Sequence, residues 1–141
     1  MKELLNWVKT SIKDNLNDFK KVEIVPDIYL IPDEKGFPAV SVIDNGIKRN
    51  NIKGQIKEDL SVKIAVFNSV FKREESIVGN NNKKGIEDLV KLIVDYFKDR
   101  YPDGYYYNVV ISNESGTQTL TNDYERFIVM KTIDLIFYRI S

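Results

Sequence analysis

Carboxylate pairs are the residues of this sequence with the most capacity for chemistry. Two neighbouring acids can bind Mg²⁺ or act together as acid and base in glycoside hydrolysis. Such pairs occur at Asp33/Glu34, Glu74/Glu75, Asp95/Asp99 and Asp123/Glu125. Only Asp95 and Asp99 have the i,i+4 spacing that puts two side chains side by side on a helix. Because Lys91 and Lys98 are close by in the sequence, we interpret this pair as a solvated salt-bridge surface and not as a metal site.

The sequence contains neither histidine nor cysteine among its 141 residues. This removes thiol nucleophiles, disulfides, imidazole catalysis and nearly all transition-metal sites. Ser115-Gly116 lacks the context of a nucleophile elbow and has no histidine to activate the serine. Gly79 and Gly85 match neither a phosphate-binding loop nor a dinucleotide fingerprint. We therefore expect a protein that is not an enzyme and that holds no cofactor and no metal.

Positive and negative side chains are balanced, with 21 of each, and the isoelectric point is near 6.3. No net field favours nucleic acid or an anionic membrane. Tyr105-Tyr106-Tyr107 could stack on bases, but alternation along a strand would bury one or two of these rings, and no basic cluster flanks them. The first residues lack the uninterrupted apolar stretch of a signal peptide, so we expect none there, and no run approaches the roughly 18 apolar residues of a membrane span. We expect a cytosolic product with no membrane and no sequence-specific nucleic-acid partner.

Two segments have the periodicity of amphipathic helices. The first is predicted over residues 3–20, and the second over residues 86–97, ended by Pro102-Asp103-Gly104. In the second, Glu87 and Asp88 are expected in the first turn and Lys98 and Arg100 in the last, which suits the helix dipole at both ends. The stripe of the first helix consists of Leu4, Leu5, Val8, Ile12, Leu16 and Phe19.

Trp7, the only tryptophan, lies about 120° from the centre of that first apolar stripe. It is therefore predicted to point away from the core face of its own helix. Two explanations remain open: other parts of the fold cover it, or it makes a contact between subunits, where tryptophan is enriched.

Extended segments alternate with turns in the rest of the chain. Strands are predicted over residues 22–31, 37–43, 60–66, 105–111, 117–121 and 127–140, with turns at residues 32–36, 44–46 and 113–116. Residues 45–58 read as a long polar loop or a projecting hairpin arm, and residues 72–85 form a second polar stretch. Segment 127–140 is apolar on both faces, so it should be covered on both sides by helices or by a neighbouring subunit.

This order of elements predicts one α+β domain over residues 1–141: a mostly antiparallel sheet, two main helices packed on one face, and long polar arms. Asp134 lies between Ile133 and Leu135 in the apolar last strand and is a candidate buried charge. It could discourage edge pairing or form an ion pair between subunits.

The order of these elements and the stretch Phe37-Pro38-Ala39-Val40 resemble the tail terminator, or tail completion, proteins of long-tailed bacteriophages and phage-derived contractile particles. The resemblance covers nearly the whole chain as an order of elements. It implies a ring, typically of six copies, that sits on the head-proximal end of the tail tube and stops its polymerisation. The implied partners are the tube protein and the sheath, neck or collar proteins, first in the host cytoplasm and then in the particle.

Several interpretations remain open from the sequence. Head–tail joining proteins share much of this architecture, a small adaptor or binding domain would fit the same composition, and a Mg²⁺-dependent nuclease is the enzymatic alternative. In the structural reading, the residues expected at interfaces are Trp7, Arg49, Lys53, Lys72, Arg73, Glu74 and Asp134.

Overall fold

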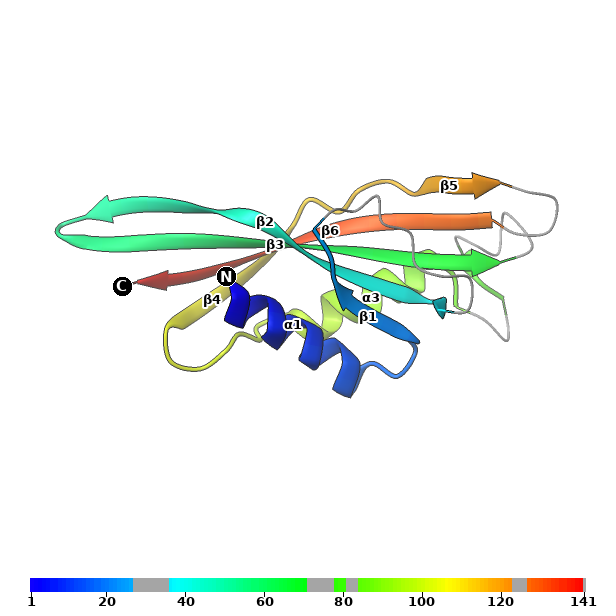
Figure 1. Cartoon of the computed structure of the whole chain (residues 1–141), viewed down its shortest axis with the longest axis horizontal. Helices are drawn as coiled ribbons and strands as arrows, with labels where there is room; N and C mark the ends of the chain where they lie inside the picture. Colours follow the sequence, from blue (N-terminus) through cyan, green and yellow to red (C-terminus); the bar gives the residue numbers. More distant parts are fainter. Residues whose placement is uncertain (27–35, 71–77, 81–83, 123–126, 141) are drawn as a thin grey trace.

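The computed structural model describes residues 1–26, 36–70, 78–80, 84–122 and 127–140. Within them the chain forms two α-helices and six strands, and the predicted single α+β domain is confirmed (Figure 1). The elements are α1 (Lys2–Asn15), β1 (Lys21–Ile24), β2 (Ala39–Ile52), β3 (Gln55–Val70), α3 (Ile86–Phe97), β4 (Tyr106–Ser112), β5 (Gln118–Asn122) and β6 (Phe127–Ile140). Residues 32–35 of the predicted turn at residues 32–36, and residues 27–31 of the strand expected over residues 22–31, lie outside the described residues.

The six strands form one mostly antiparallel sheet, five of them in the order β1-β2-β3-β6-β4, with β5 paired to β6 off this path. Only β1 is parallel to its neighbour, β2, and it pairs there with residues 39–42. Strands β4 and β5 share one edge of β6, since β4 pairs with residues 134–139 and β5 with residues 127–130. The other edge of β6 pairs with β3 over its whole length.

Both helices pack on the same face of this sheet and enclose the main core. Period-2 alternation turns the even-numbered residues of β3 and the odd-numbered residues of β6 toward the helices. The core residues are Leu4, Val8 and Ile12 of α1, Ile86, Leu89, Val90, Ile93 and Phe97 of α3, and Leu60, Val62, Ile64, Val66, Val129, Ile133, Leu135 and Phe137 of the sheet, among others. The predicted helix at residues 86–97 and strand at residues 127–140 are confirmed at both ends.

The opposite side of the sheet, which we call the open face, carries a smaller apolar cluster. It consists of Phe37, Ala39, Ile43, Ala65, Phe67 and Met130. The expectation that β6 is covered on both faces therefore holds only in part. Met130 is buried in this cluster, whereas Ile140 at the end of the strand is 47% exposed. The cluster ends before the sheet does, so the C-terminal end of β6 has an accessible apolar surface.

Helix α1 ends five residues earlier than predicted, at Asn15. The Asn15 side chain donates to the Ser11 carbonyl and to the Tyr96 hydroxyl, at 2.9 and 3.0 Å, which ties the helix end to α3. The apolar pattern had suggested continuation because Phe19 is also buried, but Phe19 reaches the core after the chain has left the helix. The prediction that Lys98 and Arg100 lie in the last turn of α3 is likewise wrong, because that helix ends at Phe97.

The turn predicted at Asp44-Asn45-Gly46 is also wrong, since β2 continues through it to Ile52. The register between β2 and β3 shifts between Asp44 and Ile47, which marks a β-bulge. Gly46 has a φ of 100°, and its N–H donates to Asp44 Oδ1 at 2.9 Å. An Asx side chain and a glycine with positive φ are found in bulges as well as in turns. Here β2 pairs with β3 on both sides of this site, so the result is a bulge.

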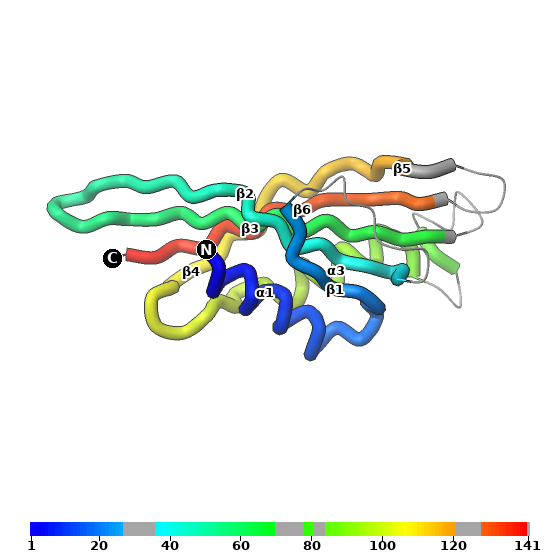
Figure 2. The backbone as a smooth tube through the Cα atoms, viewed as in Figure 1, coloured from blue at the N-terminus to red at the C-terminus, as the bar shows by residue number. Residues whose placement is uncertain are grey.

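Beyond the bulge, β2 and β3 form the projecting hairpin arm that was one of the two expectations for residues 45–58. We keep the name hairpin arm for these residues. Its turn is at Lys53 and Gly54, both with positive φ. Pairing with β6 reaches only as far as Lys57, so the tip of the arm is a two-stranded ribbon that extends past the end of β6 (Figure 2).

Candidate interaction surface

One transverse row of polar side chains crosses the sheet at the base of the hairpin arm. The register places Arg49 opposite Glu58, Glu58 opposite Arg139, and Arg139 opposite Tyr106. Each oxygen of the Glu58 carboxylate accepts from one guanidinium, at 3.0 Å from Arg49 Nε and 3.0 Å from Arg139 Nε. Arg139 Nη1 also donates to the Tyr106 hydroxyl at 3.4 Å. The row therefore links β2, β3, β6 and β4 by side chains.

Glu58 is buried in this row, with 5% of its surface exposed. The hydrogen bond from Arg139 lowers the pKa of Glu58 below its ordinary value, against the opposite effect of burial. Burial raises the pKa of Tyr106, so this phenol stays protonated at neutral pH. Neither group changes charge near pH 7, and the row therefore has the properties of a structural clamp more than of an acid–base site.

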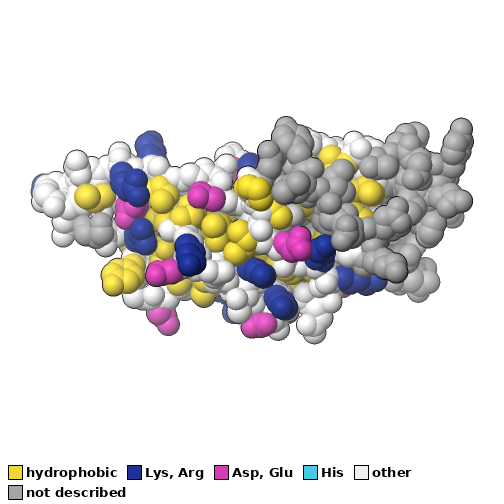
Figure 3. All heavy atoms as spheres, in the orientation of Figure 1, with side chains coloured by type: hydrophobic (Ala, Val, Ile, Leu, Met, Phe, Trp, Pro, Cys, Tyr) yellow, Lys and Arg dark blue, Asp and Glu magenta, His cyan; other side chains and the backbone are white. Residues whose placement is uncertain are grey.

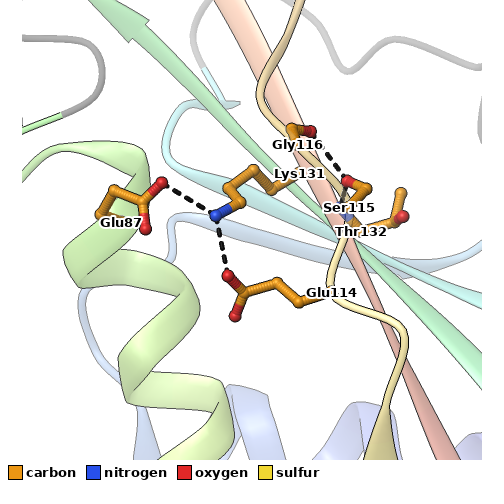
Figure 4. A network of polar contacts seen from close by, with 6 residues as sticks. All are labelled: Glu87, Glu114, Ser115, Gly116, Lys131 and Thr132. Atoms are coloured by element: carbon orange, nitrogen blue, oxygen red, sulfur yellow. Dashed lines mark hydrogen bonds and ion pairs between the residues drawn. The ribbon is translucent and has the colours of Figure 1, made fainter.

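A second buried charge, Lys131, holds α3 and the β4–β5 connection against β6. Its Nζ lies 2.8 Å from both Glu87 Oε1 and Glu114 Oε2, as Figure 4 shows. Burial alone would lower the pKa of Lys131, but the hydrogen bonds to Glu114 and Glu87 outweigh it and raise that pKa. Lys131 is thus held as a cation and is not a candidate amine nucleophile.

Ser115, next to Lys131 in Figure 4, joins the β4–β5 connection to β6 through its hydroxyl. Ser115 Oγ accepts from the Thr132 N–H at 2.8 Å and donates to the Gly116 carbonyl at 2.9 Å. The Ser115 N–H donates in turn to the Thr132 carbonyl. The hydroxyl thus both accepts and donates a backbone hydrogen bond. The structure therefore gives Ser115 the role of holding the β4–β5 connection against β6.

Asp134 lies on the open face, where its 6% exposure confirms the prediction of a buried charge. Its Oδ1 is 2.9 Å from Nζ of Lys63, which lies directly opposite on β3. Its Oδ2 accepts from the Asn113 amide at 3.3 Å. Of the two roles expected for Asp134, the ion pair exists, but its partner is within the same chain.

Trp7 packs against the main core, so the prediction that it points away from that core is wrong. Its ring makes edge contacts with Phe97 and Phe137, each with centroids 5.9 Å apart. The indole is long enough to reach the core from a position on the side of the helix. The angular position of Trp7 around the helix does not take this length into account. The first of the two explanations, cover by the fold itself, therefore holds, and a role of Trp7 at a subunit contact stays a prediction.

The remaining predicted interface residues divide between the hairpin arm and undescribed parts of the chain. Arg49 stands on β2 with 61% of its side chain exposed, although its Nε is paired with Glu58. Lys53 is exposed at the tip of the arm. Lys72, Arg73 and Glu74 lie outside the described residues. The structure thus brings Arg49 and Lys53 onto one arm, and Trp7 and Asp134 lie elsewhere.

Sequence reasoning missed Glu58, Lys131 and Arg139 as buried or half-buried charges. A signal for them was present: each occupies an inward position of a period-2 strand, in step with Leu60, Ile133 and Phe137 respectively. A charge at such a position needs a partner, because leaving it unpaired in the interior is costly.

An apolar strip on the open face was also not anticipated. The Tyr107 and Tyr138 rings lie 6.3 Å apart, and Lys57 Nζ lies 5.2 Å from the centre of the Tyr138 ring. Tyr107 and Val110 are 45% and 41% exposed. Of the three consecutive tyrosines, Tyr106 is buried, which agrees with the expectation that one or two belong to the core.

Surface charges of both signs are interspersed on the face drawn in Figure 3. In the described part of the chain no group of three or more acidic side chains is placed to hold a metal ion. No helix in that part has the length and apolarity needed to cross a membrane. Neither the models of known protein families nor the curated proteins give a match to this chain.

Proposed function

We propose that this chain is a structural subunit that assembles into a ring, most simply of six copies, on the head-proximal end of a phage-type tail tube. In this role it stops tube growth and joins the tube to a neck or collar. The observation that carries the proposal is the hairpin arm, a two-stranded ribbon that extends beyond β6 and ends at an exposed turn. A lone ribbon of this kind is only marginally stable unless it packs on something else.

The polar groups of the described residues support an assembly role over a catalytic one. Glu58, Lys131 and Asp134 are each engaged with partners of opposite charge from neighbouring elements. Because these pairs hold strands and a helix in place, they give the arm a fixed base from which to reach a neighbouring subunit. The identity of the particle rests on the resemblance in element order described above.

A register-preserving deletion of the arm tip tests this proposal. Asn51 pairs with Ile56 and Ile52 with Gln55, so removing these four residues shortens the ribbon and rejoins Asn50 to Lys53 and Gly54 to Lys57. The turn and the Glu58 row remain. We expect the shortened protein to unfold at the same denaturant concentration as the native chain but to lose ring formation and binding to tube ends in electron micrographs.

The matched control keeps the arm at full length and replaces Ile52 and Ile56 by threonine. If the length of the arm is what ring formation requires, this variant should form more rings than the deletion variant. In cells that make the particle, loss of this gene should give tubes of abnormal length or tubes without a neck. Native tube lengths and native head-proximal ends in those cells would contradict the terminator role.

A further inference from the structure

In the described part of the chain, the outer edge of β4 is a free strand edge that lacks the charged residues that usually protect one. β4 is the last strand in the sheet order, and no described strand pairs with it on the side away from β6. Its seven residues include no charge and no proline. A bulge interrupts its pairing between Tyr106 and Asn108, so the regular part runs from Asn108 to Ser112. Uncharged regular edges of this kind readily pair with another strand.

The other free edges of the described sheet carry such protection. β2 has Asp44, Lys48 and Arg49 along its length and a bulge at the base of the hairpin arm. β1 contains Lys21 and Glu23 in only four residues. β5 is polar, and a bulge breaks its short pairing with β6. Charges and bulges are the means by which sheets prevent edge-to-edge pairing, and β4 lacks a charge altogether.

We propose that two copies of this chain pair through their β4 edges, antiparallel, about a twofold axis at Val110. In this register Asn108 faces Ser112 of the second copy, Val109 faces Ile111, and Val110 faces Val110. Polar residues thus meet polar ones and apolar residues meet apolar ones, with no like charges opposed. A strand of the same sequence is therefore a suitable occupant for this edge.

The surroundings of β4 favour this arrangement on both faces of the sheet. Val109 belongs to the main core and Ile111 packs against it, so pairing would extend that core from one copy to the other. On the open face, Val110 is 41% exposed and would be covered by its counterpart. The Val109 N–H now donates to Asn108 Oδ1 at 2.8 Å, so pairing would exchange this local bond for one to the second copy.

A twofold contact uses the same surface on both copies and closes at two. It is therefore additional to any head-to-tail contact that builds a ring, and it does not depend on the function proposed above. Failure of one proposal leaves the other in place.

Disulfide trapping tests the pairing directly, because the native chain has no cysteine. Opposed residues of antiparallel strands have Cα atoms about 4.5–5.5 Å apart, a separation that a disulfide spans. Val110→Cys should therefore form a covalent dimer under mild oxidation at least about ten times faster than a cysteine that meets only by collision. The matched control is Ile24→Cys on β1, outside the arm, whose native residue is 38% exposed.

A charge variant supplies the second measurement. If the native chain dimerises through β4, sedimentation should detect a concentration-dependent dimer. Val110→Lys would place two ammonium groups opposite each other and should abolish that dimer. Ile24→Lys should leave that dimer intact. Equal oxidation rates for the two cysteine variants, or a native chain that stays monomeric at all concentrations, would overturn the proposal. So would preferential cross-linking of Val110→Cys to Lys48→Cys in a mixture, because that result assigns the β4 edge to β2 of a neighbour.

Discussion

Glu58 and Arg139 lie directly opposite each other on β3 and β6, although 81 residues separate them in the sequence. Arg139 Nε is 3.0 Å from Glu58 Oε1, and Arg49 Nε is 3.0 Å from the other carboxylate oxygen. One buried anion therefore joins three strands at the point where the hairpin arm leaves the body of the sheet (Figure 1). Beyond this row the strand pairing of the arm with β6 reaches only Lys57, so the row anchors the arm where it projects from the sheet.

Glu58→Gln should lower the free energy of unfolding at pH 7 by about 2 kcal/mol, because it removes hydrogen bonds between charged groups. The folded pKa of Glu58 lies below its ordinary value of 4.5. Its ionised form therefore stabilises the fold fully above pH 4.5 and progressively less as the pH falls through the folded pKa. Urea unfolding at a series of pH values should show the difference between native and variant protein constant from pH 6 to 8 and shrinking below about pH 4.

Asp14→Asn is the control for loss of a carboxylate, since Asp14 is exposed on α1. Its stability should stay within about 0.5 kcal/mol of the native value across this pH range. A difference between native protein and Glu58→Gln that grows as the pH falls would contradict the role given to Glu58.

Removing the Lys131 cation should cost much less stability than removing its two acidic partners. Lys131→Met leaves Glu87 and Glu114 with 49% and 43% of their side chains exposed, so both can hydrate, and we expect a change within about 1 kcal/mol. The double variant Glu87→Gln/Glu114→Gln leaves a buried ammonium without a counter-charge and should cost about 3 kcal/mol. Denaturant unfolding measures both.

The pH dependence gives a second check on Lys131. Its folded pKa is raised above 10.5, so the stability that its ion pairs contribute is present below pH 10.5 and is lost as the pH rises through the folded value. The gap between native protein and the double glutamine variant should stay open across neutral pH and close only in strong alkali. A gap that closes between pH 6 and 8 would contradict this account.

Trp7→Ala should destabilise the fold by about 3 kcal/mol, because it removes a large ring packed against Phe97 and Phe137. Trp7→Phe should cost less, since a smaller ring retains part of the edge contacts. Circular dichroism during urea unfolding compares the variants without depending on tryptophan fluorescence. If Trp7→Phe folds as well as the native chain but forms no rings, the subunit contact predicted from the sequence gains support.

Exchange of the Lys63 and Asp134 side chains tests the ion pair on the open face. Asp134→Lys alone places two cations opposite each other and should destabilise by about 3 kcal/mol or more. Adding Lys63→Asp should recover part of this loss. Recovery should be incomplete, because the Asn113 amide that now donates to Asp134 would face an ammonium instead. Additive losses in the double variant would show that the pair is not coupled.

Local patterns carried much of the fold prediction. Apolar spacing located α3 at residues 86–97 and β6 at residues 127–140, because the helical and extended periods of burial differ clearly. The same patterns failed where one local sequence is compatible with two different structures. Asp44-Asn45-Gly46 fits a turn and a bulge equally, and Phe19 continues the stripe of α1 after the helix has ended.

The candidate surface was much less accessible to prediction. The alternation of inward and outward side chains along β3 and β6 could have identified Glu58 and Lys131 as inward charges. No local rule, however, identifies the partners of these two residues. The register of β3 with β6 determines the partner of Glu58. The position of α3 on the sheet determines that Glu87 is a partner of Lys131. Trp7 was misplaced because its angular position ignores the length of the indole.

By itself, the sequence determined the composition, the absence of thiol and imidazole chemistry, the types of the main elements and the faces they bury. These follow from side-chain type and from periods of two and 3.6 residues, which are local properties. The tertiary structure alone decided that β1 runs parallel to β2, that β4 and β5 share one edge of β6, and that Glu58 meets Arg139. These are contacts between segments far apart in the chain, and their register is fixed only when the whole sheet packs against its helices.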